Sequence, residues 1–420
     1  MEVQIVGGGW SGCAAAIAAR KQGVSVTLHE RTDLLLGTGL VGGIMRNNGR
    51  FTATEEAIAL GGGELFEITD RNARHRNIEF PGHKHATLYD ISTTPPAVTD
   101  YLLSIGVKIV YHSRIEKLVM TNQTIHAIGC KKGKTYAGDV FVDATGTAGP
   151  MANCKKYGNG CAMCVLRCPS FGGRVSLTGL TGVTELVGKK SSGAVGAMSG
   201  SCKLFKESLA PEIVAELNEK GVALVPVPQS LIEDHLDIKA CQQYALAEFR
   251  DNIVLLDTGH AKLMSPYFEI HRLQQIPGLE RARYEDPYSG GQGNSMRFFA
   301  MAPRDNTLAV DGVNNLFCAG EKAGLLVGHT EAIVTGTLAG YNAARVAKGL
   351  EPVELPRSLV IGDAIAYVRE QMQTAKGLGL KYTFSGSVLF ERMKELGSYT
   401  TDIPMIRQRV EQAGLTGVFA

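Results

Sequence analysis

The stretch Val3-Gln4-Ile5-Val6-Gly7-Gly8-Gly9-Trp10-Ser11-Gly12 joins a short apolar run to a G-x-G-x-x-G glycine pattern. In this pattern Gly7 permits a tight turn, Gly9 lets the backbone approach a pyrophosphate, and Gly12 allows a helix to pack closely on a strand. A pyrophosphate there would lie at the N-terminus of the following helix, where free N–H groups and the helix dipole favour negative charge. The pattern predicts a dinucleotide-binding turn, and the alternative interpretation is a simple glycine turn.

The residues that follow complete a βαβ unit. Residues 14–21 predict a helix that stops at Gly23, and residues 24–28 predict a second strand. This order predicts a right-handed crossover and a parallel sheet. Glu30 ends the second strand, twenty-one positions after Gly9, where a carboxylate can bond ribose hydroxyls. An acid at this position disfavours a 2′-phosphate, so FAD or NAD fits better than NADP.

Two later segments distinguish FAD from NAD. Residues 140–146 and residues 315–321 each read as a strand followed by a glycine turn, and a long helix is predicted from Glu331 to about residue 348. A dinucleotide touched by both ends of the chain requires such an arrangement. The start of the long helix would offer positive potential to the pyrimidine end of a flavin. The predicted cofactor-binding residues are Gly7, Gly9, Gly12, Glu30, Arg31, Gly146, Gly320, Glu321, Gly328 and Thr330.

Length and composition limit the remaining possibilities. The chain has 420 residues, enough for two or three domains, and its net charge of +2 gives no general reason for binding to nucleic acid or membranes. Nine cysteines, an odd number, argue against a disulfide-stapled secreted protein. No apolar run approaches the length of a membrane span, and the first residues lack the features of a signal peptide. We therefore expect a soluble cytoplasmic protein without a membrane partner.

These patterns predict an α/β protein with a discontinuous, Rossmann-like FAD-binding domain of the glutathione-reductase type. That domain is predicted over residues 1–150 and 305–350, with an inserted α+β substrate domain over 151–304 and a helical tail over 351–420.

Weaker patterns predict the local structure between these segments. Residues 34–63 are rich in glycine and weakly periodic, which indicates active-site loops. Residues 107–110, 115–119 and 125–128 predict strands of an antiparallel layer, and residues 211–220 predict a polar helix.

Four cysteines lie close together in the chain. Cys154, Cys161, Cys164 and Cys168 give C-x6-C-x2-C-x3-C-P, whose end matches the spacing of bacterial iron–sulfur ligands. Three alternatives remain open: a zinc site, a redox pair of Cys161 and Cys164, or a single catalytic Cys168.

A basic stretch surrounds the cysteines. Residues 151–206 contain eight Lys or Arg and one acid, a net charge of +7 that leaves −5 for the rest of the chain. Such a stretch can hold phosphates, RNA or a polyglutamylated folate, or it can be a solvated face. Arg46 and Arg50 in the glycine-rich region are candidates for contact with an anionic substrate.

At this point the chain resembles the FAD-dependent, folate-linked tRNA uridine-modifying flavoproteins. These comprise the glucose-inhibited division protein A family and the FAD/folate-dependent tRNA (uracil-5-)-methyltransferases. The resemblance rests on residues 7–15, 61–63 with Asp70-Arg71, 276–280, 316–320 and 338–345. It implies FAD binding by the glycine turns, by Glu30 and by Glu321, and reaction with methylenetetrahydrofolate and an RNA uridine.

The chain departs from that family at specific positions. Residues 37–43 lack the cysteine that the division-protein branch carries after the second strand, and Glu321 replaces the usual glutamine. The division-protein branch has a second cysteine, and the resemblance implies that Cys168 corresponds to it.

The leading prediction is an FAD-dependent oxidoreductase in which flavin N5 exchanges a hydride or a one-carbon unit with its substrate. Cys168 is the first candidate for nucleophile or acid, and His329 can act as acid or base or as a contact of FAD. NAD(P)H is a possible electron donor. The alternatives are a folate/FAD-dependent RNA uridine methyltransferase and a flavin/iron–sulfur electron-transfer protein. The expected partner is a small molecule or RNA, and the chain is expected to form a homo-oligomer.

Overall fold

The computed structural model describes residues 1–131, 133–147, 168–189, 193–195, 201–234, 236, 244–265, 268–285 and 298–420.

A five-stranded parallel sheet with the strand order β17-β10-β1-β2-β6 organises the nucleotide-binding part of the chain. Its middle strand is buried along most of its length, which explains the nearly continuous apolar run at the start of the sequence. The parallel sheet predicted from the βαβ pattern is confirmed. Its strands come from distant parts of the sequence: β1 (Glu2–Val6), β2 (Ser25–His29), β6 (Lys108–Val110), β10 (Val140–Asp143) and β17 (Leu316–Cys318).

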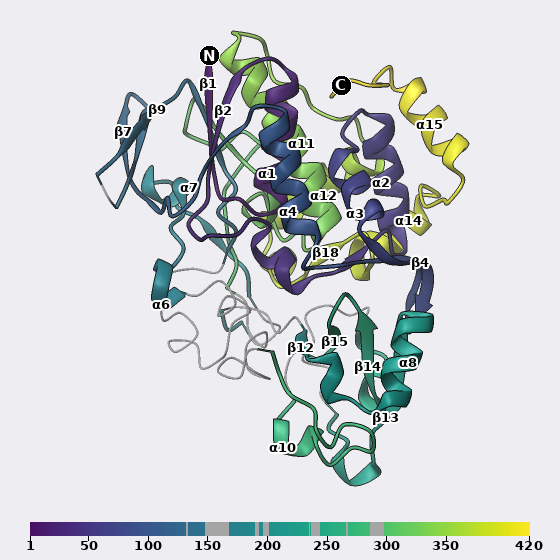
Figure 1. Ribbon diagram of the computed structural model, residues 1–420. Helices are drawn as coiled ribbons and strands as arrows, with labels where there is room; N and C mark the ends of the chain where they lie inside the picture. The colour runs from purple at the N-terminus through teal and green to yellow at the C-terminus, as the bar shows by residue number, and fades with distance from the viewer. Residues whose placement is uncertain are drawn as a thin grey trace.

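Two helices from opposite ends of the chain pack side by side next to this sheet, α1 (Trp10–Lys21) and α11 (His329–Ala347) (Figure 1). Their backbones meet closely because α11 has glycine at the contact. A Cβ on Gly336 would overlap the carbonyl oxygen of Ser11, and one on Gly340 would overlap that of Ala15. Helix packing is therefore the role of these two glycines.

Three antiparallel sheets are added to this frame. A meander is formed by β7 (Ile115–Thr121), β8 (Thr124–Cys130) and β9 (Thr135–Ala137). A second sheet, in the order β3-β5-β4, contains β3 (Ile44–Met45), β4 (Ala73–Phe80) and β5 (His83–Tyr89). A four-stranded sheet follows the order β12 (Cys202–Leu204), β15 (Ala261–Leu263), β14 (Asn252–Asp257) and β13 (Val222–Pro226).

The four-stranded sheet has a core of its own, formed with the helix α8 (Pro211–Lys220) (Figure 1). Leu204, Leu217, Leu255 and Leu263 are fully buried there. The helix begins at Pro211 and ends at Gly221, which has a φ of +78°, as its sequence predicts. A further two-stranded sheet pairs β11 (Leu186–Val187) with β16 (Ala300–Met301).

The C-terminal residues are mostly helical, with α12 (Val360–Met372), α13 (Ala375–Leu378), α14 (Ser387–Glu395) and α15 (Ile403–Gln412), and one short strand, β18 (Tyr382–Thr383). Helix α12 is held by Glu56, whose carboxylate accepts hydrogen bonds from the N–H groups of Val360 (2.9 Å) and Ile361 (2.7 Å). Burial raises the pKa of Glu56 to about 7.

Two local predictions were wrong. The region predicted as loops contains α2 (Gly49–Ala59), whose buried polar residues hide the helical period. Residues 107–110 contribute β6, which pairs in parallel with β2 and not within an antiparallel layer. The helices α3 (Glu64–Arg71) and α4 (Thr94–Ser104) follow α2 in the chain.

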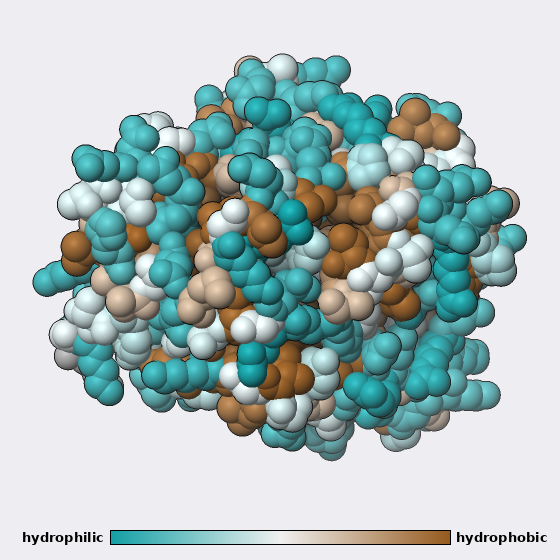
Figure 2. Space-filling model, turned by 90° about the horizontal axis from the view of Figure 1, so that it is seen from above, coloured by the Kyte–Doolittle hydropathy of each residue, from teal (hydrophilic) through white to brown (hydrophobic). Residues whose placement is uncertain are grey.

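The surface is mixed in character. The face in Figure 2 is hydrophilic over much of its area, and apolar residues appear on it in small groups. Large exposed apolar side chains, such as Leu34, Leu103 and Leu350, belong to separate segments. Within the described ranges, no helix combines the length and the apolar character that crossing a membrane requires.

Candidate functional site

Three glycine turns meet at the carboxyl ends of β1, β10 and β17. A Cβ on Gly7, where φ is +108°, would overlap the carbonyl oxygen of Ala144, and one on Gly12 would overlap the carbonyl oxygen of Gly7. A Cβ on Gly320 would lie 2.7 Å from the Ser11 hydroxyl oxygen. The structure therefore brings the first and third turns together across about three hundred residues, at the edge where open α/β sheets bind ligands.

Gly9 differs from its neighbours in the first turn. A Cβ built on Gly9 meets no described atom within 4 Å, and its φ of −70° is accessible to any residue. Gly9 is also the N-cap of α1, and within the described residues no side-chain hydrogen bond caps this helix end. Open space beside the free N–H groups of a helix N-terminus fits a pyrophosphate.

Glu30 lies buried at the end of β2 and shapes the turn. Its Oε2 accepts a hydrogen bond from the Gly8 N–H at 2.8 Å, and its Oε1 accepts from the Thr32 N–H at 2.7 Å and the Thr32 hydroxyl at 2.9 Å. A carboxylate has about four acceptor positions, so it can also accept from a ribose hydroxyl. Arg31 donates to the carbonyl of Gly172, in the segment after α6 (Cys168–Phe171).

The second turn is held by Asp143, which is fully buried at the end of β10. Its carboxylate accepts from the N–H and hydroxyl of Thr145 and from the N–H (2.7 Å) and hydroxyl (2.7 Å) of Thr178. Gly146 has a φ of +69°, and a Cβ there would lie 2.5 Å from the Arg174 guanidinium. Arg174, a member of the basic stretch, therefore lies directly on the second glycine turn.

Glu321, after the third turn, accepts a hydrogen bond from the Thr147 hydroxyl at 2.8 Å. This contact links the second and third turns. Gly320, with a φ of +65°, donates its N–H to the Thr335 hydroxyl of α11 at 2.9 Å.

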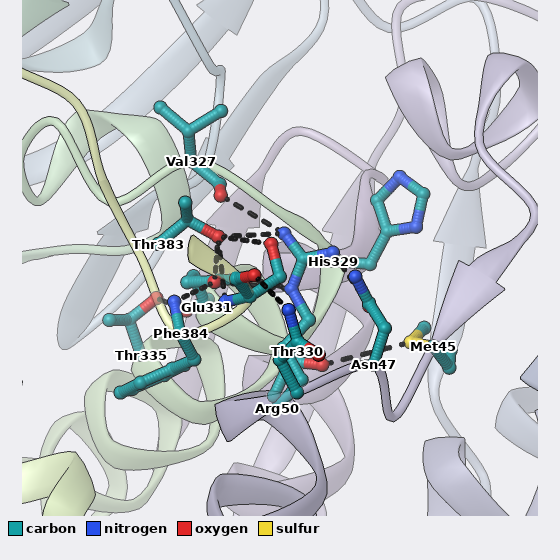
Figure 3. Close-up of polar contacts among 12 residues, drawn as sticks. Met45, Asn47, Arg50, Val327, His329, Thr330, Glu331, Thr335, Thr383 and Phe384 are labelled. Carbon is teal, nitrogen blue, oxygen red and sulfur yellow. Dashed lines mark hydrogen bonds and ion pairs between the residues drawn. The ribbon is translucent and has the colours of Figure 1, made fainter. Parts of the chain in front are cut away.

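The start of α11 is fixed by a buried ion pair (Figure 3). Glu331 is fully buried, and its carboxylate accepts from the Arg50 Nε at 3.1 Å, the Thr383 hydroxyl at 2.7 Å and the Phe384 N–H at 2.7 Å. Gly328, with a φ of +145°, has no room for a Cβ because the Arg50 and Glu331 side chains occupy that position. These contacts determine where the helix begins, and Thr330, in its first turn, is fully buried.

Both arginines suggested for an anionic substrate are engaged inside the protein. Arg50 pairs with Glu331, and Arg46 donates to both carboxylate oxygens of Asp70 (3.0 and 2.7 Å) and also to Glu55. The suggestion that they meet an anionic substrate stays a prediction, and in the structure protein carboxylates already neutralise their charge.

His329, the first residue of α11, lies in a small aromatic group. Its Nδ1 is 3.2 Å from the Tyr89 hydroxyl, and its ring centre is 6.1 Å from that of Trp10. A Cβ on Gly42 would overlap the His329 imidazole, so the loop of residues 37–43 covers this ring. Burial raises the pKa of Tyr89, which keeps its hydroxyl protonated as a hydrogen-bond donor. No sequence pattern singled out Tyr89, the last residue of the mixed polar and apolar strand β5.

Sequence reasoning also missed Lys262 in β15. Its amine donates to the carbonyl oxygens of Val41 (2.5 Å) and Gly42 (2.9 Å). Burial lowers the pKa of Lys262 to about 7, with a further contribution from Lys203 on the neighbouring strand. One lysine in an apolar strand is a weak signal, and only the fold shows that it reaches the loop.

The cysteine cluster stays a prediction. Cys154, Cys161 and Cys164 lie outside the described residues, and only the backbone of Cys168 is described, at the start of α6. The described free cysteines are Cys13, Cys130, Cys202 and Cys318, all buried.

Comparisons with known proteins agree on the kind of protein. Residues 2–155 match the family model described as FAD dependent oxidoreductase, and residues 262–351 match that of Glucose inhibited division protein A. The methylenetetrahydrofolate–tRNA-(uracil-5-)-methyltransferase TrmFO of Enterococcus faecalis is 32% identical over 178 residues, and that of Bacillus cytotoxicus is 33% identical. Each alignment covers 40% of this chain and 38% of the relative, so the match spans about two fifths of these relatives' length.

Solved structures extend the similarity to the whole fold. Two crystal forms of Aquifex aeolicus GidA align with 98% of this chain, with TM-scores of 0.60 and 0.59 at 14% and 16% identity. They cover 76% and 78% of the GidA chains and confirm the predicted fold class. The two family matches and the curated relatives support a GidA/TrmFO-like, FAD-dependent family for this chain, and the solved structures show the shared fold.

Proposed function

We propose that this protein is an FAD-dependent oxidoreductase whose flavin exchanges a hydride or a one-carbon unit with a substrate at N5. The observation that carries the proposal is the open space at Gly9, beside the uncapped start of α1 and between glycine turns from both ends of the chain. FAD, when bound, supplies the electron-transfer chemistry.

Residues of all three turns would contribute to FAD binding, each at a different part of the cofactor. The N–H groups at the start of α1 would bind the pyrophosphate, and Glu30 would accept from the ribose. The start of α11, with Gly328 and Thr330, would place positive potential at the pyrimidine end of the flavin. His329 can hold or release a proton on its imidazole, and the protonated Tyr89 hydroxyl, 3.2 Å from Nδ1, orients the ring.

A second candidate is a folate- and FAD-dependent RNA uridine methyltransferase. It is favoured by the identity with the TrmFO relatives, whose name describes this reaction for them. The absence of cysteine from residues 37–43 weighs against it, since the related division-protein branch carries a thiol there, and Cys168 would be the remaining nucleophile. The substrate is accordingly proposed to be a small molecule or an RNA.

A visible absorption spectrum of the purified protein tests FAD binding. We expect flavin bands and release of FAD on denaturation; a colourless protein that takes up no added FAD would refute the proposal. Reduction of the flavin by NADH or NADPH, followed separately by methyl transfer from labelled methylenetetrahydrofolate to tRNA, distinguishes the two candidates. Iron and sulfide analysis of anaerobically prepared protein tests the electron-transfer alternative.

A further inference from the structure

We propose that Lys262 is a positioning residue of the FAD site, which holds the loop of residues 37–43 between the four-stranded sheet and the start of α11. The part that concerns FAD rests on the proposed function. The contact between lysine and loop does not.

The loop connects the two ends of the candidate site. Before it, the Leu36 N–H donates to the carbonyl of Gly8 at 2.8 Å, so the chain enters the loop from the first glycine turn. At its other end, Gly42 lies against the imidazole of His329, the first residue of α11. The loop therefore runs from the predicted pyrophosphate position to the predicted flavin position, and any displacement of it changes both.

Lys262 is the connection between this loop and the four-stranded sheet. Its amine lies only 2.5 Å from the carbonyl oxygen of Val41 and 2.9 Å from that of Gly42, and it is buried. Within the described part of the chain, no carboxylate forms an ion pair with Lys262, and its amine donates hydrogen bonds to these two backbone carbonyl oxygens. A protonated amine donates strongly to carbonyl oxygens, whereas a neutral amine donates weakly. The strength of the contact thus depends on the charge of Lys262.

The surroundings of Lys262 place that change of charge near neutral pH. Burial and the nearby Lys203 lower its pKa to about 7. Lys203 is directly opposite on β12 and pairs with Glu285 at 3.0 Å. The neighbouring Cys202 remains a neutral thiol, because burial raises its pKa to about 12. Among the described residues, the titratable groups that act on Lys262 are Cys202 and Lys203 on β12, and Lys203 is paired with Glu285; Tyr89 and His329 lie against Gly42, whose carbonyl accepts from Lys262.

Two substitutions fix the charge of residue 262. Lys262→Arg keeps a positive charge at every working pH, and Lys262→Met keeps a similar length without charge. We expect the FAD dissociation constant and the visible flavin spectrum of the wild type to change with pH between about 5.5 and about 8.5. The wild type should resemble Lys262→Arg at the acid end and Lys262→Met at the alkaline end. At about pH 6 the Met variant should bind FAD about tenfold more weakly than the wild type.

Lys203→Met supplies a control that leaves residue 262 unchanged. Removal of the neighbouring positive charge should move the midpoint of the wild-type titration to higher pH without removing the titration. A simple loss of packing would not move the midpoint in a defined direction. If Lys262→Met fails to fold, the Arg variant and Lys203→Met decide the question by the same pH series.

Hydrogen exchange separates this inference from the proposed function. In the full chain without flavin, the Gly39 amide donates to the Leu36 carbonyl and the Gly42 amide to the Gly39 carbonyl, and we expect faster exchange at both in Lys262→Met. If the wild type binds no FAD, the proposed function fails and the exchange data still test the contact. Equal exchange, equal FAD affinity and one pH profile for all variants would overturn the inference.

Discussion

The open space at Gly9 gives the sharpest test of the cofactor site. Gly9→Ala adds one methyl group at a position where no described atom lies within 4 Å and where φ is −70°. Such a change stabilises an unstrained chain by about 0.4–1 kcal/mol, and the poorer helix cap offsets a similar amount. The free energy of unfolding of the flavin-free protein should therefore change by less than about 1 kcal/mol.

FAD binding should respond quite differently. A methyl group on Gly9 occupies the space into which the pyrophosphate must come, and it separates the phosphate from the N–H groups of α1. Loss of one charge-assisted hydrogen bond costs about 1.5–3 kcal/mol, and weaker interaction with the helix terminus adds about 0.3–1 kcal/mol. A total of about 2–4 kcal/mol corresponds to a loss of affinity of about 30- to 1,000-fold.

The assay is titration of flavin-free protein with FAD, followed by flavin fluorescence, beside urea unfolding of the same samples. Gly23→Ala is the matched control, since Gly23 is exposed, has a φ of +76° and has open space around it. That variant should lose about 1–2 kcal/mol of stability from backbone strain and keep its FAD affinity. Unchanged FAD affinity in a folded Gly9→Ala protein would refute the assignment of the pyrophosphate to this turn.

Three other outcomes depend on buried contacts. Because burial raises the pKa of Glu56 from 4.5 to about 7, the folded state keeps a proton that the unfolded state releases, and the free energy of unfolding should fall by about 3 kcal/mol as pH rises through this window. Urea unfolding at several pH values measures this fall, and Glu56→Gln should flatten the dependence on pH. An equally steep dependence in that variant would contradict the prediction. Arg50→Leu leaves the Glu331 carboxylate buried without its partner and should lower the free energy of unfolding, measured in urea, by about 3–5 kcal/mol. Replacement of both residues by Leu should lower it by less. Additive effects in the double variant would show that the two groups do not interact. Gly340→Val should prevent the close contact of α1 with α11, because its Cβ would overlap the Ala15 carbonyl, and a variant with an unchanged melting temperature would contradict this packing.

Much of the fold was predictable because its signals are local. The residues of β1 and the G-x-G-x-x-G pattern give the first strand, turn and helix within twenty positions, and Pro211 and Gly221 mark both ends of α8. Prediction failed at α2, where Thr52 and Glu56 are buried through tertiary contacts and disguise the apolar face of the helix.

The sequence by itself determined the parallel sheet, the glycine turns and the kind of cofactor, because strand period, turn glycines and the acid at position 30 are readable from neighbouring residues. Only the tertiary structure decided which side chains stand beside those turns. Arg50 reaches Glu331 across 281 positions, and Lys262 reaches Gly42 across 220. No local pattern encodes such contacts, since they depend on how separate elements pack and on which charged groups this packing removes from water.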